Sequence, residues 1–536
     1  MSDARRGALA ATSAAEMLEV QADRLGERPY LRCGEQDWIS YAELDERSGV
    51  VAAGLQELGV KRGDRVLILS ANSVEVAETI FACSKLGAVQ VPINTYLRGS
   101  FLQHQVDDSG AVVAVADAQG LRSLERLGSA DKIEHLVVTG ECDDGHHDCL
   151  AFAQLYNGGT PLRSVRPGPS ELAAIMYTSG TTGLAKGCMI PHGMFVSPMA
   201  TYSKAGYVQS GDRVLTPSPL FHMGCQSAML MAPLANDASA CFVERFSASD
   251  FMPRARKVGA TVLYGVGAAA IAILRQPPHE EDSINRLRCA VWTPLAADQA
   301  DEFERRFGVR TTTEAYGQTE FLPISLGNVE ANIGRGGVGA PVEIAEVCVL
   351  DDRDRPVEVG EVGEIAVRPR QPDVMSIGYW GIPEASLHSI SNLWHHTGDL
   401  GRLDEEGRLS IIDRKVDALR RRGENVSSSE LEGAIRRHPG VDDVAVFGVP
   451  SAMSEDDIMA CIRTTSERTV TPAELFEFFR RELPYFAIPR YVDLVTEFPV
   501  NALGRIRKDL LRKAGVTPST WDLEALGFTV TPQERR

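Results

Sequence analysis

The sequence predicts an α/β protein with a large N-terminal domain and a small, mobile α+β C-terminal domain. Alternating strand and helix patterns between residues 14 and 138 predict a parallel or mixed sheet covered by helices. Short strand patterns between residues 343 and 413, separated by Gly, Pro and Asp, indicate a β-rich subdomain. Beyond a basic run at residues 414–422, helix and strand patterns resume. The length of 536 residues fits several units of about 150 residues each.

The first elements follow from apolar periodicity and capping. Residues 17–25 have helical periodicity, and Ser40 with Glu43 forms a capping-box pattern ahead of a helix at 41–58. A strand at 65–69 leads into a helix at 73–86. Further strands are expected at 88–91, 112–116 and 133–138. Strands that alternate with helices in this way belong to a parallel or a mixed sheet.

The second half of the chain predicts strands at 343–350, 363–368 and 408–413. A helix at 428–437, a strand at 441–449, a helix at 472–483 and a strand at 491–494 follow. We therefore expect an N-terminal domain at 1–412, a hinge at 413–417 and a mobile C-terminal domain at 418–536.

Composition excludes several classes of protein. The charge sum of 55 basic and 73 acidic residues is −18, which disfavours binding to nucleic acid or to anionic lipid. Prolines interrupt the long uncharged stretch at 214–236, and no apolar signal segment follows the N-terminus, so no membrane span or leader is expected. The ten cysteines show no Cys-x-x-Cys spacing and are expected to be buried, reduced thiols of a cytoplasmic protein.

The strongest local signal is a loop rich in glycine and hydroxyl groups behind an apolar strand at 172–177. Glycines let backbone N–H groups approach an anion, and hydroxyls and a lysine add donors, so the loop is predicted to bind phosphate. Its glycine spacing differs from that of a Walker A loop, and a flexible surface loop is the alternative interpretation. The residues concerned are Thr178, Ser179, Gly180, Thr181, Thr182, Gly183 and Lys186.

Other motifs follow this loop in a fixed order. Tyr316-Gly317-Gln-Thr319-Glu320 comes after an expected strand at 310–315, and Trp394-His-His-Thr397-Gly398-Asp399 lies further on. Then come Asp413-Arg414, Gly423-Glu-Asn425 and Gly504-Arg505. This ordered set resembles the adenylate-forming superfamily of acyl- and aryl-CoA synthetases, peptide-synthetase adenylation domains and luciferases, from about residue 14 to residue 512. The segments 221–226 and 423–426 look most similar to carnitine/crotonobetaine-CoA ligases.

The resemblance implies two half-reactions. A carboxylic acid of small or medium size would attack the α-phosphate of Mg–ATP and release pyrophosphate, and the thiol of coenzyme A would then displace AMP. It implies catalytic roles for Lys186, His222, Thr319, Glu320 and Arg505. ATP would also contact residues 178–183, Tyr316, Gly317, Asp399 and Arg414. Mg²⁺ would bind at Thr182 and Glu320. The implied acyl pocket contains His222, Tyr264, Gly265, Val266, Gly317 and Phe321, and the implied acceptor channel contains Arg422 and Gly423.

Three positions depart from the family pattern. Arg505 stands where a lysine is usual, Arg422 replaces a glycine beside the acceptor tunnel, and Val416 replaces a charged hinge residue. Three interpretations stay open: an acyl- or aryl-CoA ligase, an adenylate-forming enzyme with another acceptor, and a degenerate nucleotide-binding protein. The other acceptor would be a carrier protein, an amine, or an aromatic amine diazotised with nitrite. Either a monomer or a homodimer is compatible with the sequence.

Overall fold

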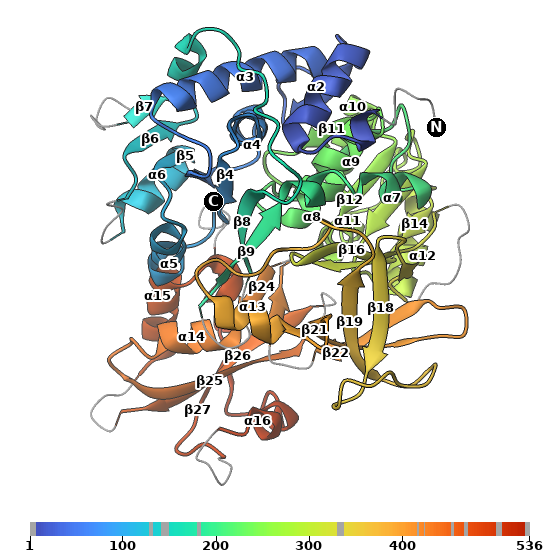
Figure 1. Cartoon of the computed structure of the whole chain (residues 1–536). Helices are drawn as coiled ribbons and strands as arrows, with labels where there is room; N and C mark the ends of the chain where they lie inside the picture. Colours follow the sequence, from blue (N-terminus) through green and yellow to red (C-terminus); the bar gives the residue numbers. More distant parts are fainter. Residues whose placement is uncertain are drawn as a thin grey trace.

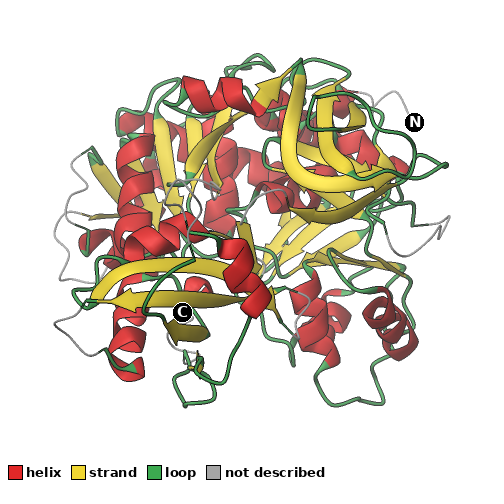
Figure 2. Cartoon of the chain, turned by 90° about the horizontal axis from the view of Figure 1, so that it is seen from below, coloured by secondary structure: helices red, strands yellow, loops and turns green. Residues whose placement is uncertain are grey.

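The computed structural model describes residues 7–127, 132–140, 149–178, 184–329, 337–414, 418–422, 424–451, 455–465, 470–499 and 506–530. The N-terminal layers lie above the C-terminal part, which is drawn in orange and red (Figure 1). Helices pack on the strands of the layered sheets (Figure 2). Among the helices in these ranges, none is long and apolar enough to cross a membrane.

The first layered sheet has seven strands in the order β7-β6-β5-β3-β4-β8-β9. Its strands pair in parallel apart from β8 and β9, which form an antiparallel pair. The strands are β3 (Arg65–Leu69), β4 (Val89–Pro92), β5 (Val113–Ala116), β6 (His135–Val138), β7 (Cys149–Ala151), β8 (Leu172–Thr178) and β9 (Lys186–Pro191). The helix α3 (Tyr41–Glu57) precedes these strands, and α4 (Val74–Leu86), α5 (Gly99–Ser109), α6 (Ala118–Glu125) and η1 (Phe152–Asn157) lie between them in the sequence.

A second seven-stranded sheet has the order β14-β13-β12-β10-β11-β1-β2 and is parallel except for β2 at its edge. Its strands are β1 (Pro29–Cys33), β2 (Ile39–Ser40), β10 (Arg213–Thr216), β11 (Ser239–Phe242), β12 (Val262–Gly265), β13 (Cys289–Trp292) and β14 (Thr311–Thr312). Its helical segments are α2 (Ala14–Leu25), η2 (His192–Phe195), α7 (Met199–Lys204), α8 (Met223–Cys225), η3 (Gln226–Met231), α9 (Ala232–Ala235), α10 (Phe251–Val258), α11 (Gly267–Leu274) and α12 (Ala297–Phe307).

Antiparallel strands complete the N-terminal domain. A three-stranded sheet contains β15 (Ala315–Gln318), β16 (Phe321–Leu326) and β17 (Ala340–Pro341). A five-stranded sheet contains β18 (Ala345–Leu350), β19 (Gly363–Pro369), β20 (Ile390–Ser391), β21 (Trp394–Leu403) and β22 (Leu409–Arg414), and α13 (Pro383–Ser389) precedes β20. This sheet is the β-rich subdomain that the sequence predicts.

The C-terminal domain is smaller and has α+β structure. The hairpin β23 (Ala418–Arg421) and β24 (Glu424–Ser427) leads into a four-stranded sheet of β25 (Val441–Pro450), β26 (Asp456–Thr464), β27 (Tyr491–Leu494) and β28 (Trp521–Asp522). Its helical segments are α14 (Ser428–Ile435), α15 (Pro472–Glu482), η4 (Tyr485–Ala487) and α16 (Lys508–Ala514). Of the expected hinge, residues 415–417 lie outside the described residues.

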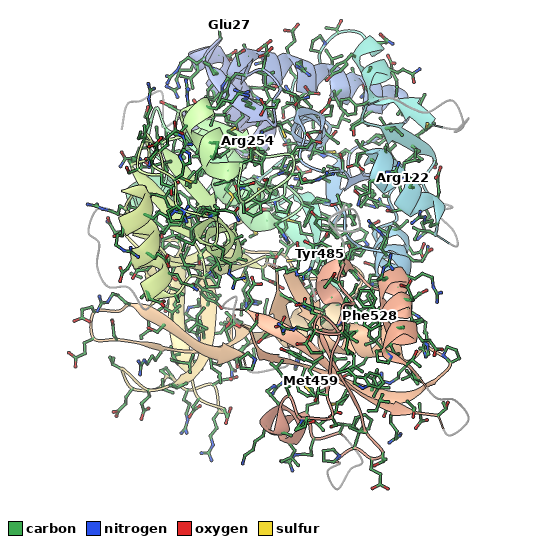
Figure 3. The ribbon with its side chains drawn as sticks, turned by 180° about the vertical axis from the view of Figure 1, so that it is seen from behind. Glu27, Arg122, Arg254, Met459, Tyr485 and Phe528 are labelled. Carbon is green, nitrogen blue, oxygen red and sulfur yellow. The ribbon has the colours of Figure 1, made fainter. Side chains whose placement is uncertain are left out.

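One cluster of buried apolar side chains continues from the first layered sheet into the C-terminal domain. It joins Leu102 of α5 and Val91 of β4 to Leu431 of α14 and Phe476 and Phe479 of α15. Seen from behind, Tyr485 lies where the two parts meet, whereas Met459 and Phe528 lie within the C-terminal part (Figure 3). Burial of this apolar surface stabilises the observed arrangement of the two domains.

The structure corrects two expectations from the sequence. The expected strand at 310–315 is two elements, β14 and β15, because the chain leaves the parallel sheet after Thr312 and pairs antiparallel with β16 from Ala315. The cysteines are not uniformly reduced: eight described cysteines are free, but the half-exposed Cys149 is disulfide-bonded. Cys149 lies at an edge strand, where burial does not shield the sulfur.

Candidate active site

The expected phosphate loop connects two paired strands. Thr178 ends β8, Lys186 begins β9, and the two residues face each other in the antiparallel register. The backbone N–H of Ala185 donates to a carboxylate oxygen of Glu430, and its carbonyl oxygen lies 2.8 Å from Nε2 of His104. Both ends of the loop are therefore held. Five of the predicted ligands, Ser179, Gly180, Thr181, Thr182 and Gly183, lie outside the described residues.

Lys186 and Glu320 both contact the side chain of one tyrosine, Tyr379, which the sequence analysis did not identify. The ammonium of Lys186 lies 5.1 Å from the centroid of the Tyr379 ring. The Tyr379 hydroxyl donates to Oε1 of Glu320 at 2.8 Å. Burial and the adjacent Glu320 carboxylate raise the pKa of Tyr379, so the hydroxyl stays a donor. The half-buried Thr319 precedes Glu320 in the turn between β15 and β16.

The carboxylate of Asp399 is held by two side chains from β15. The Tyr316 hydroxyl donates to Oδ2 at 2.6 Å, and Nε2 of Gln318 donates to the same oxygen at 2.9 Å. Nε2 of Gln318 also donates to the carbonyl of Thr397, which fixes the amide. The backbone of Asp399 on β21 faces that of Arg414 on β22. Two residues predicted to contact the nucleotide, Tyr316 and Asp399, thus lie in direct contact.

The residues assigned to the acyl pocket have different environments. Phe321 is fully buried in the core, and Tyr264 is nearly so, with its ring edge-on to that of Tyr207. Gly265 lies against the indole of Trp292: a Cβ atom there would come within 2.8 Å of Cζ3. Val266 is half-buried. A larger residue at 265 would displace the indole, so the close approach explains the glycine.

Gly317 is packed closely against the side chain of Leu322. A Cβ atom at this position would lie 2.3 Å from Cδ1 of Leu322. A side chain here would have to displace Leu322, so glycine allows the close approach of β15 and β16 that the structure shows. This packing places Tyr316 and Gln318, on either side of Gly317, against Asp399.

His222 is exposed toward the C-terminal domain. Its side chain is 42% exposed, and Nε2 lies 3.2 Å from Oε1 of Glu424, at the start of β24. Glu424 follows Gly423, which lies outside the described residues. The preceding residue, Arg422, has a left-handed backbone with φ of 55° and places its guanidinium 5.5 Å from the centroid of the Tyr485 ring. The segment that carries the expected acceptor channel thus lies close to the expected acyl site.

A second contact between the domains involves Glu430 of α14, which accepts the Ala185 N–H at 2.5 Å. Burial raises the pKa of this carboxyl to about 7. Arg505 lies outside the described residues. Lys508, three residues further along the sequence, is bound within the C-terminal domain to Ser428 at 3.0 Å and to Glu432 at 2.7 Å. In this arrangement Lys508 therefore does not take the place of the usual catalytic lysine.

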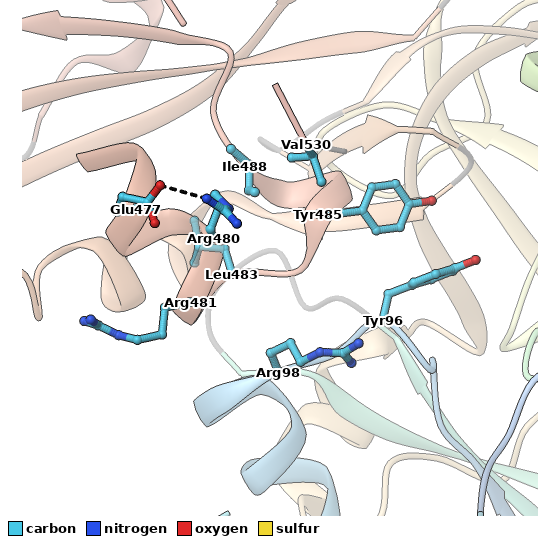
Figure 4. Close-up of a pocket in the computed structure, with 9 residues that line it drawn as sticks. All are labelled: Tyr96, Arg98, Glu477, Arg480, Arg481, Leu483, Tyr485, Ile488 and Val530. Carbon is cyan, nitrogen blue, oxygen red and sulfur yellow. Dashed lines mark hydrogen bonds and ion pairs between the residues drawn. The ribbon is translucent and has the colours of Figure 1, made fainter. Parts of the chain in front are cut away.

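A pocket of about 230 Å³ opens between the two domains. Tyr96 and Arg98 come from the loop between β4 and α5, and the other side is formed by α15, η4 and the C-terminal segment (Figure 4). The rings of Tyr96 and Tyr485 meet edge-on at 4.7 Å. The lining residues are Tyr96, Arg98, Glu477, Arg480, Arg481, Leu483, Tyr485, Ile488 and Val530. No sequence signal marked this pocket, because its basic residues are scattered over two distant segments.

The N-terminal domain matches the family described as AMP-binding enzyme over residues 18–380, and residues 430–505 match the C-terminal domain of the same enzymes. A crotonobetaine/carnitine–CoA ligase from Salmonella paratyphi A is 32% identical over 491 residues, which cover 88% of this chain and 93% of that protein. The enzyme of this description from Escherichia coli O139:H28 is 31% identical over 514 residues, with coverages of 92% and 98%.

Solved structures of CoA ligases have the same fold as this chain. The o-succinylbenzoate CoA synthetase of Bacillus subtilis, bound with the product analogue OSB-NCoA, superposes with a TM-score of 0.80 at 25% identity, covering 94% of this chain and 98% of that one. An anthranilate CoA ligase in complex with anthranoyl-AMP gives 0.68 at 25% identity, with coverages of 94% and 97%.

These relatives do not favour a non-thiol acceptor or a degenerate protein. The chain therefore belongs to the AMP-binding enzyme family and is an AMP-forming acid–thiol ligase.

Proposed function

We propose that the chain activates a small carboxylic acid with Mg–ATP and then transfers the acyl group to the thiol of coenzyme A. The observation that carries the acceptor assignment is the pocket between the domains. Arg98, Arg480 and Arg481 supply positive charge there, and Tyr96 and Tyr485 supply aromatic surface. Guanidinium groups bind phosphate in a bidentate manner, and aromatic rings stack on bases, so the pocket suits the nucleotide end of coenzyme A.

The superposition does not by itself select the acceptor. The solved CoA ligase that holds a coenzyme A product analogue gives a TM-score of 0.80, and an amide bond synthetase gives the same score, so the acceptor assignment rests on the pocket. The contacts of His222 with Glu424 and of Ala185 with Glu430 bring β24 and α14 to the expected acyl and phosphate sites. We infer that this arrangement is the one used for thiol transfer.

For the first half-reaction, negative charge on the α-phosphate and on the departing pyrophosphate must be stabilised by donors and a metal ion. Thr178, Lys186 and the loop between them would contact the phosphates, and Thr319 would donate to the α-phosphate. Asp399 would accept from the ribose hydroxyls, Tyr316 would stack on adenine, and Arg414 would contact ribose or phosphate. Arg505, at the usual position of the catalytic lysine, would contact the acid and the α-phosphate.

The residues present fit a magnesium ion. Glu320 uses Oε1 to accept the Tyr379 hydroxyl, whereas no residue in the described ranges donates to Oε2. Mg²⁺ prefers carboxylate oxygens and keeps several waters, so a single half-exposed carboxylate beside the phosphate loop suits it. Bound there with ATP, it would neutralise phosphate charge, and Thr182 is the second proposed ligand.

The acid is proposed to be small or of medium size. Trp292 closes the space behind Gly265, and Tyr264 and Phe321 are packed into the core, so the described residues leave little depth for a long acyl chain. His222, at the boundary with the C-terminal domain, would face the carboxylate. The relatives named above give crotonobetaine and carnitine as the first acids to test.

The test is pyrophosphate release from Mg–ATP over a panel of small acids that includes crotonobetaine and carnitine, with and without coenzyme A. We expect release that depends on one acid and a thioester product, identified by mass spectrometry, that needs coenzyme A. Glu320→Ala serves as the matched variant and should lose most of the adenylation while it stays folded. Adenylate formation without any thioester would contradict the acceptor assignment, and no turnover with any acid would contradict the substrate class.

A further inference from the structure

Tyr379 occupies a fixed position between the residues assigned to phosphate and to metal. The segment 376–380 is bonded to β9: Met189 N–H donates to the carbonyl of Gly378, and Trp380 N–H donates to the carbonyl of Gly187. The backbone of Tyr379 also pairs with that of Cys188. Its N–H donates to Oγ of Ser386 at 2.8 Å. The ring is therefore held by the same strand that begins with Lys186.

The carboxylate of Glu320 is held from this segment as well. The Ser376 N–H donates to the backbone carbonyl of Glu320 at 2.8 Å, and the Tyr379 hydroxyl donates to its side-chain Oε1. A hydrogen bond to a charged acceptor is stronger than one between neutral groups. This bond takes one carboxylate oxygen and leaves Oε2 as the oxygen that faces no donor among the described residues.

The ring also lies beside the cation. The ammonium of Lys186 is 5.1 Å from the ring centroid, within the range of a cation–π contact. Within the parts of the chain that the structure describes, Lys186 and Glu320 form no ion pair. A lysine and a carboxylate that paired with each other would offer less charge to phosphate and metal, because each would neutralise the other.

We propose that Tyr379 is a positioning residue for Mg–ATP, with two separable parts. Its hydroxyl orients the Glu320 carboxylate so that Oε2 is presented to the metal. Its ring holds the ammonium of Lys186 over its face and apart from Glu320, so that the lysine stays available to phosphate. The inference deepens the proposed function, since it rests on the assignment of Mg–ATP to this site.

Two variants separate the two parts. Tyr379→Phe removes the hydroxyl and keeps the ring, so it should loosen Glu320 alone. Tyr379→Leu removes both and leaves Lys186 able to pair with Glu320. Groups that orient metal ligands typically change metal affinity by about 10–100-fold when they are lost. Tyr156→Phe is the matched control, because Tyr156 also donates to a buried carboxylate, that of Glu78, in η1 and away from β9.

The experiment is calorimetric titration of the full chain with ATP, without acid or coenzyme A, once with Mg²⁺ in excess and once with EDTA. Tyr379→Phe should lose about 10-fold or more in affinity with Mg²⁺ and stay within about two-fold in EDTA. Tyr379→Leu should lose affinity under both conditions. Tyr156→Phe should bind as the original chain does under both. The melting temperature of each variant is recorded beside its titration.

Equal weakening of Tyr379→Phe with Mg²⁺ and with EDTA would show a merely structural role and overturn the proposal. Unchanged binding in Tyr379→Phe would overturn it too. In the background Glu320→Gln, the hydroxyl should no longer matter, so the double variant should bind Mg–ATP as the single Glu320→Gln variant does. If the original chain itself failed to bind Mg–ATP, the proposed function would fall, which differs from either result with the variants.

Discussion

Asp399 carries a buried carboxylate that we assign to the ribose of ATP. Its side chain is buried, and two donors, Tyr316 and Gln318, converge on Oδ2. We expect Asp399→Asn to raise the KM for ATP by about 10–100-fold, because hydrogen bonds to a charged group contribute about 1.5–3 kcal/mol. Initial rates of pyrophosphate release at varied ATP test this. An unchanged KM would remove Asp399 from the nucleotide site.

Arg422 combines an unfavourable backbone with a long cationic side chain. A non-glycine residue at a φ of 55° costs of order 1–3 kcal/mol unless its side chain offsets the strain. Here the guanidinium lies over Tyr485, which lines the pocket between the domains. We expect Arg422→Gly to relieve the backbone and to raise the KM for coenzyme A several-fold, while acid-dependent pyrophosphate release without coenzyme A stays the same.

The comparison with Arg422→Lys separates charge from shape, because lysine keeps the charge and lacks the planar group. Thioester formation at varied coenzyme A is the measurement. A KM for coenzyme A that does not change in Arg422→Gly would mean that this arginine serves the fold of the β23–β24 hairpin rather than the acceptor.

Among the helices, α3 shows how a short sequence motif determines where a helix begins. Oγ of Ser40 accepts the Glu43 N–H at 3.0 Å, and the Glu43 carboxylate accepts the Ser40 N–H at 2.8 Å. We expect Ser40→Ala to lower the free energy of unfolding by about 1 kcal/mol, because it leaves a helix N–H without its partner. Urea denaturation followed by circular dichroism measures the change. A loss of activity with no loss of stability would contradict this purely structural role.

The elements with strong local signals were predictable, and those decided by tertiary pairing were not. The capping box of α3 and the apolar strand β3 are confirmed, because their patterns need no distant partner. The strand β26, which was not predicted, begins with Asp456 and Asp457. Its acidic start is stabilised by tertiary contacts, since Arg421 and Arg490 pair with Asp457 at 3.3 and 3.0 Å.

The site was predictable only in part for the same reason. The motifs around Thr319, Glu320 and Asp399 could be identified in the sequence, since each is a contiguous run of residues. Tyr379 and Glu430 could not, because their roles depend on contacts with Glu320 and Ala185, far away in the chain. The pocket between the domains requires both domains to be placed before any of its basic residues become neighbours.

In the whole molecule, the raised pKa of Glu430 predicts that pH affects how the two domains are arranged. Burial raises its pKa to about 7, from an ordinary 4.5, although the hydrogen bond from the Ala185 N–H acts in the opposite direction. We call the molecule docked when the C-terminal domain contacts the N-terminal domain as in the structure. Between these two pH values Glu430 is protonated in the docked form and ionised in the undocked form. Docking therefore weakens as pH rises from about 4.5 to about 7. We expect small-angle scattering to show a rising fraction of undocked molecules over this window. Glu430→Gln should remove the dependence.

A control lies in the N-terminal domain. Burial also raises the pKa of Glu314 to about 7, and Glu314 makes none of the contacts between domains described above. Glu314→Gln should therefore leave the pH dependence of the scattering profile intact. An identical response in the two variants would mean that the change with pH reports general loosening of the protein rather than docking.

The pocket whose walls come from two domains has a thermodynamic consequence. A ligand that touches both walls is also an effector, since it adds to the stability of the docked form by about 2.7 kcal/mol at a concentration 100 times its Kd. The coupling is reciprocal: any substitution that loosens docking lowers the ligand's apparent affinity by the same factor, even far from the pocket. For coenzyme A, the ligand proposed for this pocket, the free concentration would therefore set the fraction of molecules whose two domains are docked.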